Sequence, residues 1–418
     1  MTILKKSKIK NILGREILDS RGWPTVEIEL RTTEGVFFSS SPSGASKGKR
    51  EAREIRDKNK KRFFGRGVID QLKKIKEFVL PKILNKDPRD QELIDRILFE
   101  INEKNKEPIL GTNLTTPISQ AICRAGAKAR NLFLFQYIAQ LFFKKEIKKF
   151  SLPKPFFNMI NGAQHSGSFL ALQEFLISCH HKKFSENLRR GVEYYYLLKD
   201  FLRKEKGPLS FNVGDEGGFV PSFSKTKEVL ELLLKIIKKK EGGQFLRISL
   251  DCAANSFFKN GFYIFEGKKM KSEDLLSFYK EILKKYSLFS FEDPFEENDF
   301  EGFKKMKELK GDFFVFGDDL LASQSERIKW AQEKKLCDGL LLKINQVGTL
   351  SQAIESARLA KQFNWKIMVS HRSGETCDDF ISDFAVGIFS DFIKAGAPSR
   401  GERVVKYNRL LKIEEILK

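Results

Sequence analysis

The chain has 418 residues, and its 76 Lys and Arg against 55 Asp and Glu give a formal net charge of +21. Its hydrophobic fraction of 41% is ordinary for a globular protein, which excludes a mostly disordered chain, a collagen-like chain and a disulfide scaffold. The five cysteines are scattered without a zinc-binding spacing, and no apolar stretch approaches the ~18 residues of a membrane span. We therefore expect a globular, untargeted protein in the reduced cytoplasm.

The first third of the chain combines strand and helix patterns. Residues 25–30 and 35–38 are predicted as strands joined by a Thr-Glu-Gly turn. From residue 62 to residue 140, apolar side chains recur at helical spacing. The Lys-rich stretch 144–149 then leads into two prolines, which is typical of a linker between domains.

Beyond residue 156, short apolar runs alternate with amphipathic helical segments. The runs are 245–250, 288–291, 313–316, 339–342, 366–370 and 392–393, and the helices between them are 272–286, 300–309, 325–335, 350–362 and 378–390. Continuous apolar strands that alternate with helices indicate a parallel sheet buried on both faces, and so many units favour a closed barrel. We expect an N-terminal α+β domain over residues 1–140 and a barrel that carries the active site over residues 141–418.

Each of these apolar runs is followed by an ionisable residue. In chain order they are Asp251, Glu292 with Asp293, Asp318 with Asp319, Lys343, His371 with Arg372, and Lys394. The carboxyl ends of barrel strands converge on one face, where enzymes of this architecture keep their active sites. The sequence therefore predicts an active site at that face, against the alternative that each strand merely ends in a polar loop.

Three of these residues form a candidate metal site. Asp251, Glu292 and Asp318 are carboxylates from successive strands, and hard oxygen ligands suit Mg²⁺. Without an ion they would repel one another and raise one another's pKa. We expect Lys343 and Lys394, on later strands, to lie close to the ion and to each other, where neighbouring positive charge lowers the pKa of a lysine toward neutrality and lets it act as a base. Solvated acids and ordinary surface lysines are the alternatives.

Other polar motifs surround this set. Arg372 and Ser373 offer a guanidinium and a hydroxyl suited to a phosphate or a carboxylate. Glu216 lies in the Gly-rich stretch 212–218, where the backbone can turn sharply and bring the acid close to a ligand, although an ordinary turn has the same composition. Residues 43–48 have the composition of a flexible loop that could act as a lid.

The motifs follow one another in the order of a known family. They are residues 17–22, the loop 43–48, 161–165 with 173–174, 212–218, 251–254, 292–295, 317–320, 341–346, 369–376 and 393–398. Ten short motifs in one order, over nearly the whole chain, resemble the enolase family. Nearby departures include Lys47, where the family loop usually has Thr.

The resemblance implies a fold, a reaction and a set of site residues. The fold is a TIM-type (β/α)8 barrel with modified early strands, preceded by an α+β domain with a three-stranded meander. The reaction is the glycolytic or gluconeogenic, reversible dehydration of 2-phosphoglycerate to phosphoenolpyruvate, with two Mg²⁺ per active site. The implied residues are Glu216, Lys343, Glu174 and His165 for catalysis; His165, Gln173, Glu174, Lys343, Arg372, Ser373 and Lys394 for substrate binding; and Asp251, Glu292, Asp318 and Ser46 for metal.

The resemblance further implies specific roles and a homo-oligomer. Lys343 is the implied base, Glu216 the implied acid, and Arg372 with Ser373 the implied phosphate receiver. Family members are homodimers or larger assemblies. For His165 alone, a satisfied structural histidine is the alternative.

Two alternative functions come from other observations. The net charge of +21 is compatible with binding to nucleic acid or to surface partners, but no RNA-binding motif accompanies the scattered basic groups, so we expect at most a secondary role. A related enzyme for a non-phosphorylated acid, or an inactive relative, is the other alternative. The joint presence of Arg372, Ser373, Glu174 and Glu216 favours the phosphorylated substrate and an active enzyme over both.

Overall fold

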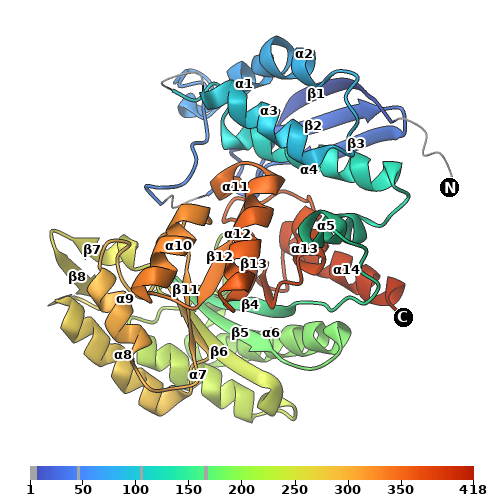
Figure 1. Ribbon diagram of the computed structural model, residues 1–418. Coiled ribbons are helices and arrows are strands. Elements are labelled where there is room, and N and C mark those ends of the chain that lie inside the picture. The colour runs from blue at the N-terminus through green and yellow to red at the C-terminus, as the bar shows by residue number, and fades with distance from the viewer. Residues whose placement is uncertain (1–6, 45–47, 104–106, 164–167) are drawn as a thin grey trace.

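Two separate sheets organise the chain, an N-terminal meander and a closed barrel of eight strands (Figure 1). The computed structural model describes residues 7–44, 48–103, 107–163 and 168–418. The barrel confirms the TIM-type fold predicted from the alternating apolar runs and helices.

The N-terminal sheet is the antiparallel meander β1 (Ile9–Leu18), β2 (Pro24–Thr32) and β3 (Gly35–Ser40). Its helices are α1 (Ile69–Lys74), the π-helical turn η2 (Ile75–Val79), α2 (Leu80–Ile83), α3 (Gln91–Glu103) and α4 (Thr112–Ala129). Val26, Ile28 and Leu30 on β2 pack with Leu114 and Ile118 of α4 in a buried cluster of their own. The two predicted strands are confirmed, each with a few more residues.

The barrel strands follow the order β10-β11-β12-β13-β14-β4-β5-β6. Their bounds are β4 Lys154–Asn161, β5 Glu174–Cys179, β6 Leu246–Asp251, β10 Ser290–Glu292, β11 Phe314–Gly317, β12 Gly339–Leu342, β13 Lys366–Ser370 and β14 Phe392–Lys394. β5 pairs antiparallel with both β4 and β6, whereas the other neighbours are parallel. The early strands therefore break the simple βα order, as the resemblance implied.

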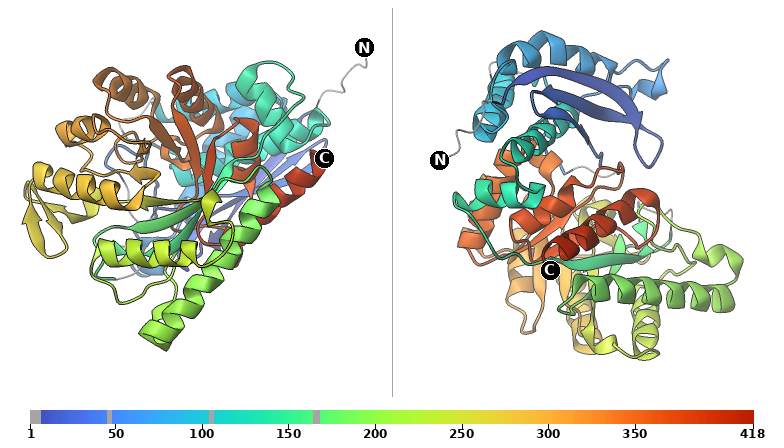
Figure 2. Two further views of the ribbon diagram at one scale, coloured as in Figure 1. Left: turned by 90° about the horizontal axis from the view of Figure 1, so that it is seen from below. Right: turned by 90° about the vertical axis from the view of Figure 1, so that its right-hand side faces the viewer.

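Helices surround the barrel on its outer side (Figures 1 and 2). They are α5 Leu134–Phe143, α6 Phe184–Lys206, α7 Thr226–Lys238, α8 Ser272–Tyr286, α9 Phe300–Lys307, α10 Ser325–Lys334, α11 Ile344–Val347, α12 Leu350–Gln362, α13 Phe380–Gly387 and α14 Gly401–Ile416. α8 buries Leu275, Tyr279, Ile282 and Tyr286, the spacing of one helical face, so its apolar pattern explains its position against the barrel. The predicted helices 272–286 and 350–362 match α8 and α12 residue for residue.

Some elements were not among the predicted runs. β4 and β5 are consecutive strands that pair antiparallel, and neither was among the predicted apolar runs. A small antiparallel sheet, β7 (Phe258–Lys259), β8 (Phe262–Phe265) and β9 (Lys268–Met270), is inserted before α8. The predicted domain boundary at residue 140 falls inside α5, which packs against α13 of the barrel. The boundary itself stays a prediction.

The N-terminal domain lies over the carboxyl ends of the barrel strands (Figures 1 and 2). Ser43 and Gly374 exchange two backbone hydrogen bonds of 2.7 and 2.9 Å, and the amide of Ala52 donates to the carbonyl of Gln346 at 3.0 Å. These bonds bring Ser43 and Ala52 to the end of the barrel at which the predicted site residues lie. No helix in the described part of the chain is long and apolar enough to cross a membrane.

Candidate active site

The strand register brings the predicted acids to one level of the barrel. Glu174 at the start of β5 pairs with Asp251 at the end of β6, and Asp251 pairs with Glu292 at the end of β10. On the other side of the barrel, Lys394 ends β14 opposite Ser370 of β13. We call this end of the barrel, where the parallel strands finish, the mouth.

Lys394 is enclosed by three carboxylates. Its Nζ lies 2.7 Å from Glu292 Oε2 and 3.1 Å from both Asp251 Oδ2 and Glu174 Oε2, and all four side chains are buried. Burial alone would lower the pKa of Lys394, but the charges of Asp251, Glu174 and Glu292 outweigh it and raise that pKa well above its usual value. The expectation that neighbouring positive charge lowers the pKa of this lysine is therefore wrong for the protein without a metal.

Lys343, which follows β12, bonds to one carboxylate. Its Nζ lies 2.5 Å from Asp318 Oδ2, and the other oxygen of Asp318 accepts a bond of 2.8 Å from Gln346 Nε2. Burial opposes the charged form of Lys343, but Asp318 outweighs burial and raises the lysine pKa. The pKa of Asp318 is lowered in turn, because Lys343 outweighs the effect of burial on it. In the protein without a metal the Lys343 pKa is therefore not lowered, because an acid faces it more closely than any cation does, and the lowering expected beside an ion stays a prediction.

The predicted metal ligands have the chemistry that a divalent cation needs. Burial, and then the charges of their neighbours, raise the pKa values of Asp251 and Glu292, as expected for carboxylates that converge without an ion. Glu292 Oε1 is buried and has no hydrogen-bond partner among the described residues. A hard cation would satisfy that oxygen and remove the repulsion between the acids, so these residues fit Mg²⁺.

The closest groupings of acids in the described residues are not the predicted trio. Ligand atoms within 4.8 Å of one another occur in two sets, Glu174–Glu216–His371 and Asp293–Asp318–Asp319. Asp293 accepts the backbone N–H groups of Asp318 and Asp319 at 3.0 and 2.6 Å. Asp293 therefore holds the loop that positions Asp318.

Glu216 lies beside Glu174 and His371. Its Oε2 accepts a bond of 2.8 Å from Asn158 Nδ2 and lies 3.6 Å from His371 Nε2. Gly218 makes this approach possible, because a Cβ there would come within 2.5 Å of Asn161 Oδ1 and 2.8 Å of Asn158 Oδ1. The Gly-rich stretch thus allows the close packing that the sequence predicted around Glu216.

Arg372 meets a carboxylate from the N-terminal domain. Its Nη1 and Nη2 lie 2.8 and 3.2 Å from the two oxygens of Glu51, and both side chains are buried. Burial would lower the pKa of Arg372, but Glu51 outweighs it and raises that pKa. The predicted phosphate receiver therefore holds an anion supplied by the chain itself. Ser373, next to it, is also buried.

The remaining predicted residues divide into two groups. Gln173 Nε2 donates to Asp251 Oδ2 at 3.2 Å, which brings Gln173 into the same network, and no residue that the structure describes bonds to its buried Oε1. Ser46, Lys47 and His165 lie outside the described residues.

Sequence reasoning missed several residues that contact the predicted set. Asn158 is a buried polar residue inside the apolar strand β4, and a polar side chain in such a run is the signal that could have found it. Glu51 and Arg403 lie in segments rich in charged residues, where nothing in the sequence distinguishes them from exposed neighbours.

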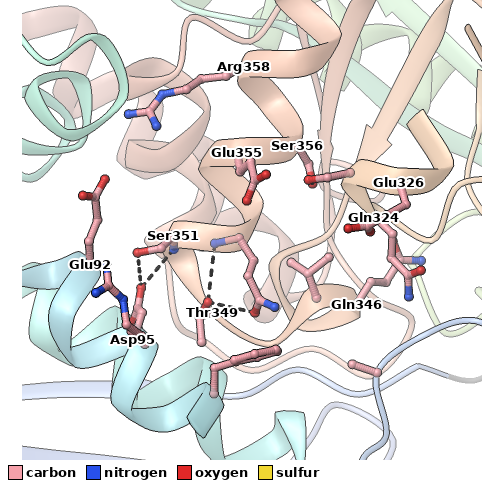
Figure 3. Close-up of a pocket in the computed structure, with 16 residues that line it drawn as sticks. Glu92, Asp95, Gln324, Glu326, Gln346, Thr349, Ser351, Glu355, Ser356 and Arg358 are labelled. Atoms are coloured by element: carbon pink, nitrogen blue, oxygen red, sulfur yellow. Dashed lines mark hydrogen bonds between the residues drawn. The ribbon is translucent and has the colours of Figure 1, made fainter. Parts of the chain in front are cut away.

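A separate cavity of about 750 Å³ lies where α3 of the N-terminal domain faces α10 and α12 (Figure 3). Asp95 on α3 accepts bonds of 2.9 and 2.6 Å from the backbone N–H and the hydroxyl of Ser351, the second residue of α12. Gln346 is among its lining residues, so the cavity lies next to the mouth, but none of the predicted site residues that the structure describes lines it. Its polar groups join the two domains.

Comparisons with known proteins agree with this architecture. The family model described as "Enolase, C-terminal TIM barrel domain" matches residues 149–418, and that described as "Enolase, N-terminal domain" matches residues 9–138. The chain is 43% identical to an enolase of Mastigamoeba balamuthi, over 98% of this chain and 96% of that protein. It is 42% identical to an enolase of Methanocaldococcus jannaschii, over 99% of this chain and 96% of that protein. It is also 43% identical to enolase B of Dictyostelium discoideum, over 98% of this chain and 95% of that protein.

Proposed function

The chain belongs to the enolase family of hydro-lyases, and from this we propose that it catalyses the reversible, Mg²⁺-dependent dehydration of 2-phosphoglycerate to phosphoenolpyruvate. The reaction removes a proton from C2 and a hydroxide from C3. It therefore needs a base, an acid and a means to stabilise the negative charge that builds up on the substrate carboxylate.

Lys343 is the proposed base. Its ammonium group is buried on Asp318, and its pKa is raised in the protein without metal. A metal ion on Asp318 would offset the negative charge that now favours the protonated lysine, so a neutral amine becomes accessible at the ordinary pH of the cell. Lys343 would then accept the C2 proton at Nζ.

Glu216 is the proposed acid, with Glu174 beside it. The acid must hold a proton and deliver it to the departing C3 hydroxyl. The position of Glu216 supports this assignment, because one carboxyl oxygen each of Glu216 and Glu174 and a ring nitrogen of His371 lie within 4.8 Å of one another. Asn158 fixes the orientation of Glu216 by its bond of 2.8 Å.

Asp251, Glu292 and Asp318 would hold the catalytic Mg²⁺, and Ser46 is the proposed ligand of a second one. When bound, the metal supplies positive charge to the carboxylate of the substrate. Lys394 lies among Asp251, Glu292 and Glu174 and would add a second positive charge at the same place.

Arg372, Ser373, Gln173 and His165 are the proposed contacts to the rest of the substrate. The guanidinium of Arg372 presents a planar pair of donors that matches a phosphate, and it already binds the two oxygens of Glu51 in that way. The buried position of this cation supports the selection of a phosphorylated acid over an acid that lacks the phosphate.

Location and assembly follow the family in this proposal. We infer a cytoplasmic enzyme that acts as a homodimer or a larger homo-oligomer on 2-phosphoglycerate and phosphoenolpyruvate. Nucleic acid stays a hypothesis for a secondary partner only, on account of the net charge of +21.

The observation that carries the proposal is that Lys394, which is buried, and Lys343, whose side chain is 12% exposed, lie among acids at the mouth, with a buried arginine next to them. The test is to add 2-phosphoglycerate to the purified protein with and without Mg²⁺ and to follow the ultraviolet absorbance of the enol product. We expect product only with Mg²⁺, and none from glycerate, which lacks the phosphate. Absence of Mg²⁺-dependent product at high protein concentration would refute the proposal.

A further inference from the structure

Arg403, near the start of α14, is buried completely and contacts two segments of the mouth, residues 371–373 and Asp215. Its Nη1 lies 2.6 Å from His371 Nδ1 and donates to the carbonyl of Arg372 at 2.7 Å. Its Nη2 donates to the carbonyls of Asp215 and Ser373 at 3.0 and 2.6 Å. One guanidinium thus joins the loop of Glu216 to the loop of Arg372 and Ser373.

The chemistry of this contact determines where His371 carries its proton. A guanidinium has N–H donors and no acceptor, so the ring nitrogen that faces it must accept the bond. Nδ1 is therefore unprotonated, and in a neutral imidazole the proton is on Nε2. Nε2 lies 3.6 Å from Glu216 Oε2, is buried, and has no hydrogen-bond partner in the described part of the chain.

The charges around the ring favour the neutral form. Burial, and then the charge of Arg403, lower the pKa of His371 well below its usual value. The other charged groups that face it are Lys406 on α14, Lys394 on β14, Glu174 on β5 and Glu216. The cations outweigh the acids, so His371 stays a neutral ring with one N–H.

We propose that Arg403 is a positioning residue that holds His371 as the neutral Nε2–H tautomer and directs this single donor toward Glu216 in the active site. The proposal rests on the proposed function only in that Glu216 is the acid of the reaction. A fixed N–H beside Glu216 keeps the ring from exchanging protons with the acid, so the proton that Glu216 delivers is not lost to the imidazole.

The surroundings of Arg403 show why an arginine is needed. Gly396 leaves room for its stem, because a Cβ at Gly396 would come within 2.8 Å of Arg403 Cδ. A lysine has one nitrogen instead of a planar fork and cannot reach the ring and three carbonyl oxygens from one place. The variant Arg403→Lys therefore keeps the charge and loses the geometry.

The test uses the full protein with ¹⁵N-labelled histidine. The chain has four histidines, so the imidazole signals are few, and the variant His371→Gln assigns the signal of His371 by its absence. In the wild type we expect an Nε2–H tautomer that does not titrate between about pH 5 and pH 9. A protonated Nδ1, or a normal titration, overturns the proposal, and this measurement requires no variant at Arg403 to fold.

Kinetics provide the second readout. We expect Arg403→Lys to lower kcat by about 10- to 100-fold with little change in KM, and to mix the His371 tautomers. In the His371→Gln background the same substitution should have little further effect on kcat. Equal losses in both backgrounds would overturn the proposal.

The matched control is Arg409→Lys on the same helix, which breaks a bidentate pair with Asp383 at 2.6 and 2.7 Å away from the mouth. It should lower the melting temperature without changing the His371 signal. The histidine spectra are recorded without substrate. An inactive protein with the expected tautomer would count against the proposed function and not against this inference.

Discussion

The two ends of the barrel differ in the side chains that they bury, which are charged at the mouth and aromatic at the opposite end. At the mouth, buried lysines and carboxylates neutralise one another, as in the contacts of Lys394 with Asp251 and Glu292. The opposite, amino-terminal end is filled by aromatic rings, and Phe289, Phe314 and Phe392 lie just before or at the starts of their strands. There the pKa of His180 is lowered to about 4, first by burial and then by Lys154 and Arg247.

The groups proposed for activity therefore lie at one end of the barrel strands, and the aromatic packing that stabilises the fold lies at the other. Charges at the mouth are costly to bury and are kept together only by mutual pairing. Rings at the other end contribute packing without any such cost, and the ring of Phe392 lies 5.1, 5.6 and 6.1 Å from those of Phe156, Phe289 and Phe316. Substitutions at the mouth should therefore change activity, and substitutions at the aromatic end should change stability.

The largest expected effect is that of Lys343→Ala. Removal of the proposed base should lower kcat by about 10²- to 10⁴-fold, because proton transfer by a positioned group contributes that much. The Mg²⁺-dependent assay with 2-phosphoglycerate measures this loss. Circular dichroism should show the same secondary structure as the wild type.

A matched lysine at the other end of the barrel is the control for this variant. Lys366 begins β13 and pairs with Asp391 at 3.0 Å, so Lys366→Ala also breaks an ion pair of a barrel strand. It should leave kcat within about twofold of the wild type. A Lys343→Ala enzyme that retains a tenth or more of the activity would contradict the role of Lys343.

The second expected effect is on stability. Phe392→Ala should lower the free energy of unfolding by about 3–5 kcal/mol, because it opens a cavity among four packed rings. Chemical denaturation measures the change. Phe64→Ala, at a ring that is 83% exposed, should change it by no more than about 0.5 kcal/mol. Equal effects of the two substitutions would show that the aromatic layer does not stabilise the barrel.

The residues of the mouth differ in whether the sequence could predict their positions. The acids and lysines of the mouth follow apolar runs directly, so Asp251, Glu292, Asp318, Lys343 and Lys394 could be assigned to one face by the parallel topology alone. Glu51 and Arg403 could not, and Asn158 is marked only as a polar residue inside an apolar run. Their positions depend on the antiparallel start of the barrel, on the N-terminal domain and on the last helix, which pack on the mouth from distant parts of the chain.

The sequence also failed to predict the lysine pKa values, for a physical reason. It shows that two lysines lie at neighbouring strand ends, but not that each of them faces carboxylates at 2.5–3.1 Å. Coulomb energy depends on those distances and on burial, which only the folded structure sets. The type of site was therefore predictable, whereas its electrostatic balance was not.

A smaller effect is expected at Glu51, which brings the N-terminal domain to the mouth. Glu51→Gln removes the negative charge that now faces Arg372, so an anionic ligand no longer competes with it. We expect the affinity for phosphoenolpyruvate to rise by up to about tenfold, or about 1.4 kcal/mol. Isothermal titration calorimetry without turnover measures the change.

Glu107→Gln is the matched control for this variant. Glu107 also pairs with an arginine of the N-terminal domain, Arg53, at 2.5 Å, but on the exposed surface. Its substitution should leave the affinity for phosphoenolpyruvate unchanged. If Glu51→Gln binds phosphoenolpyruvate no more tightly than the wild type does, Glu51 does not compete for Arg372.

The smallest expected effect concerns His180 at the aromatic end. Its folded-state pKa of about 4 is below the usual 6.5, so the unfolded chain binds this proton more readily. The contribution of the neutral ring is complete above about pH 6.5 and is lost as the pH falls toward 4. Between pH 7 and pH 5 the loss is at most about 2 kcal/mol, and partial exposure of the ring reduces it.

His180→Gln isolates this contribution, because glutamine does not titrate in this range and can still bond to Ser178, which His180 contacts at 2.9 Å. Free energies of unfolding at pH 7 and pH 5 should differ less in this variant than in the wild type. His181→Gln retains His180 and should keep the wild-type difference. If His180→Gln also keeps that difference, the ring takes up its proton as readily in the fold as in the unfolded chain, and the aromatic end does not exclude charge.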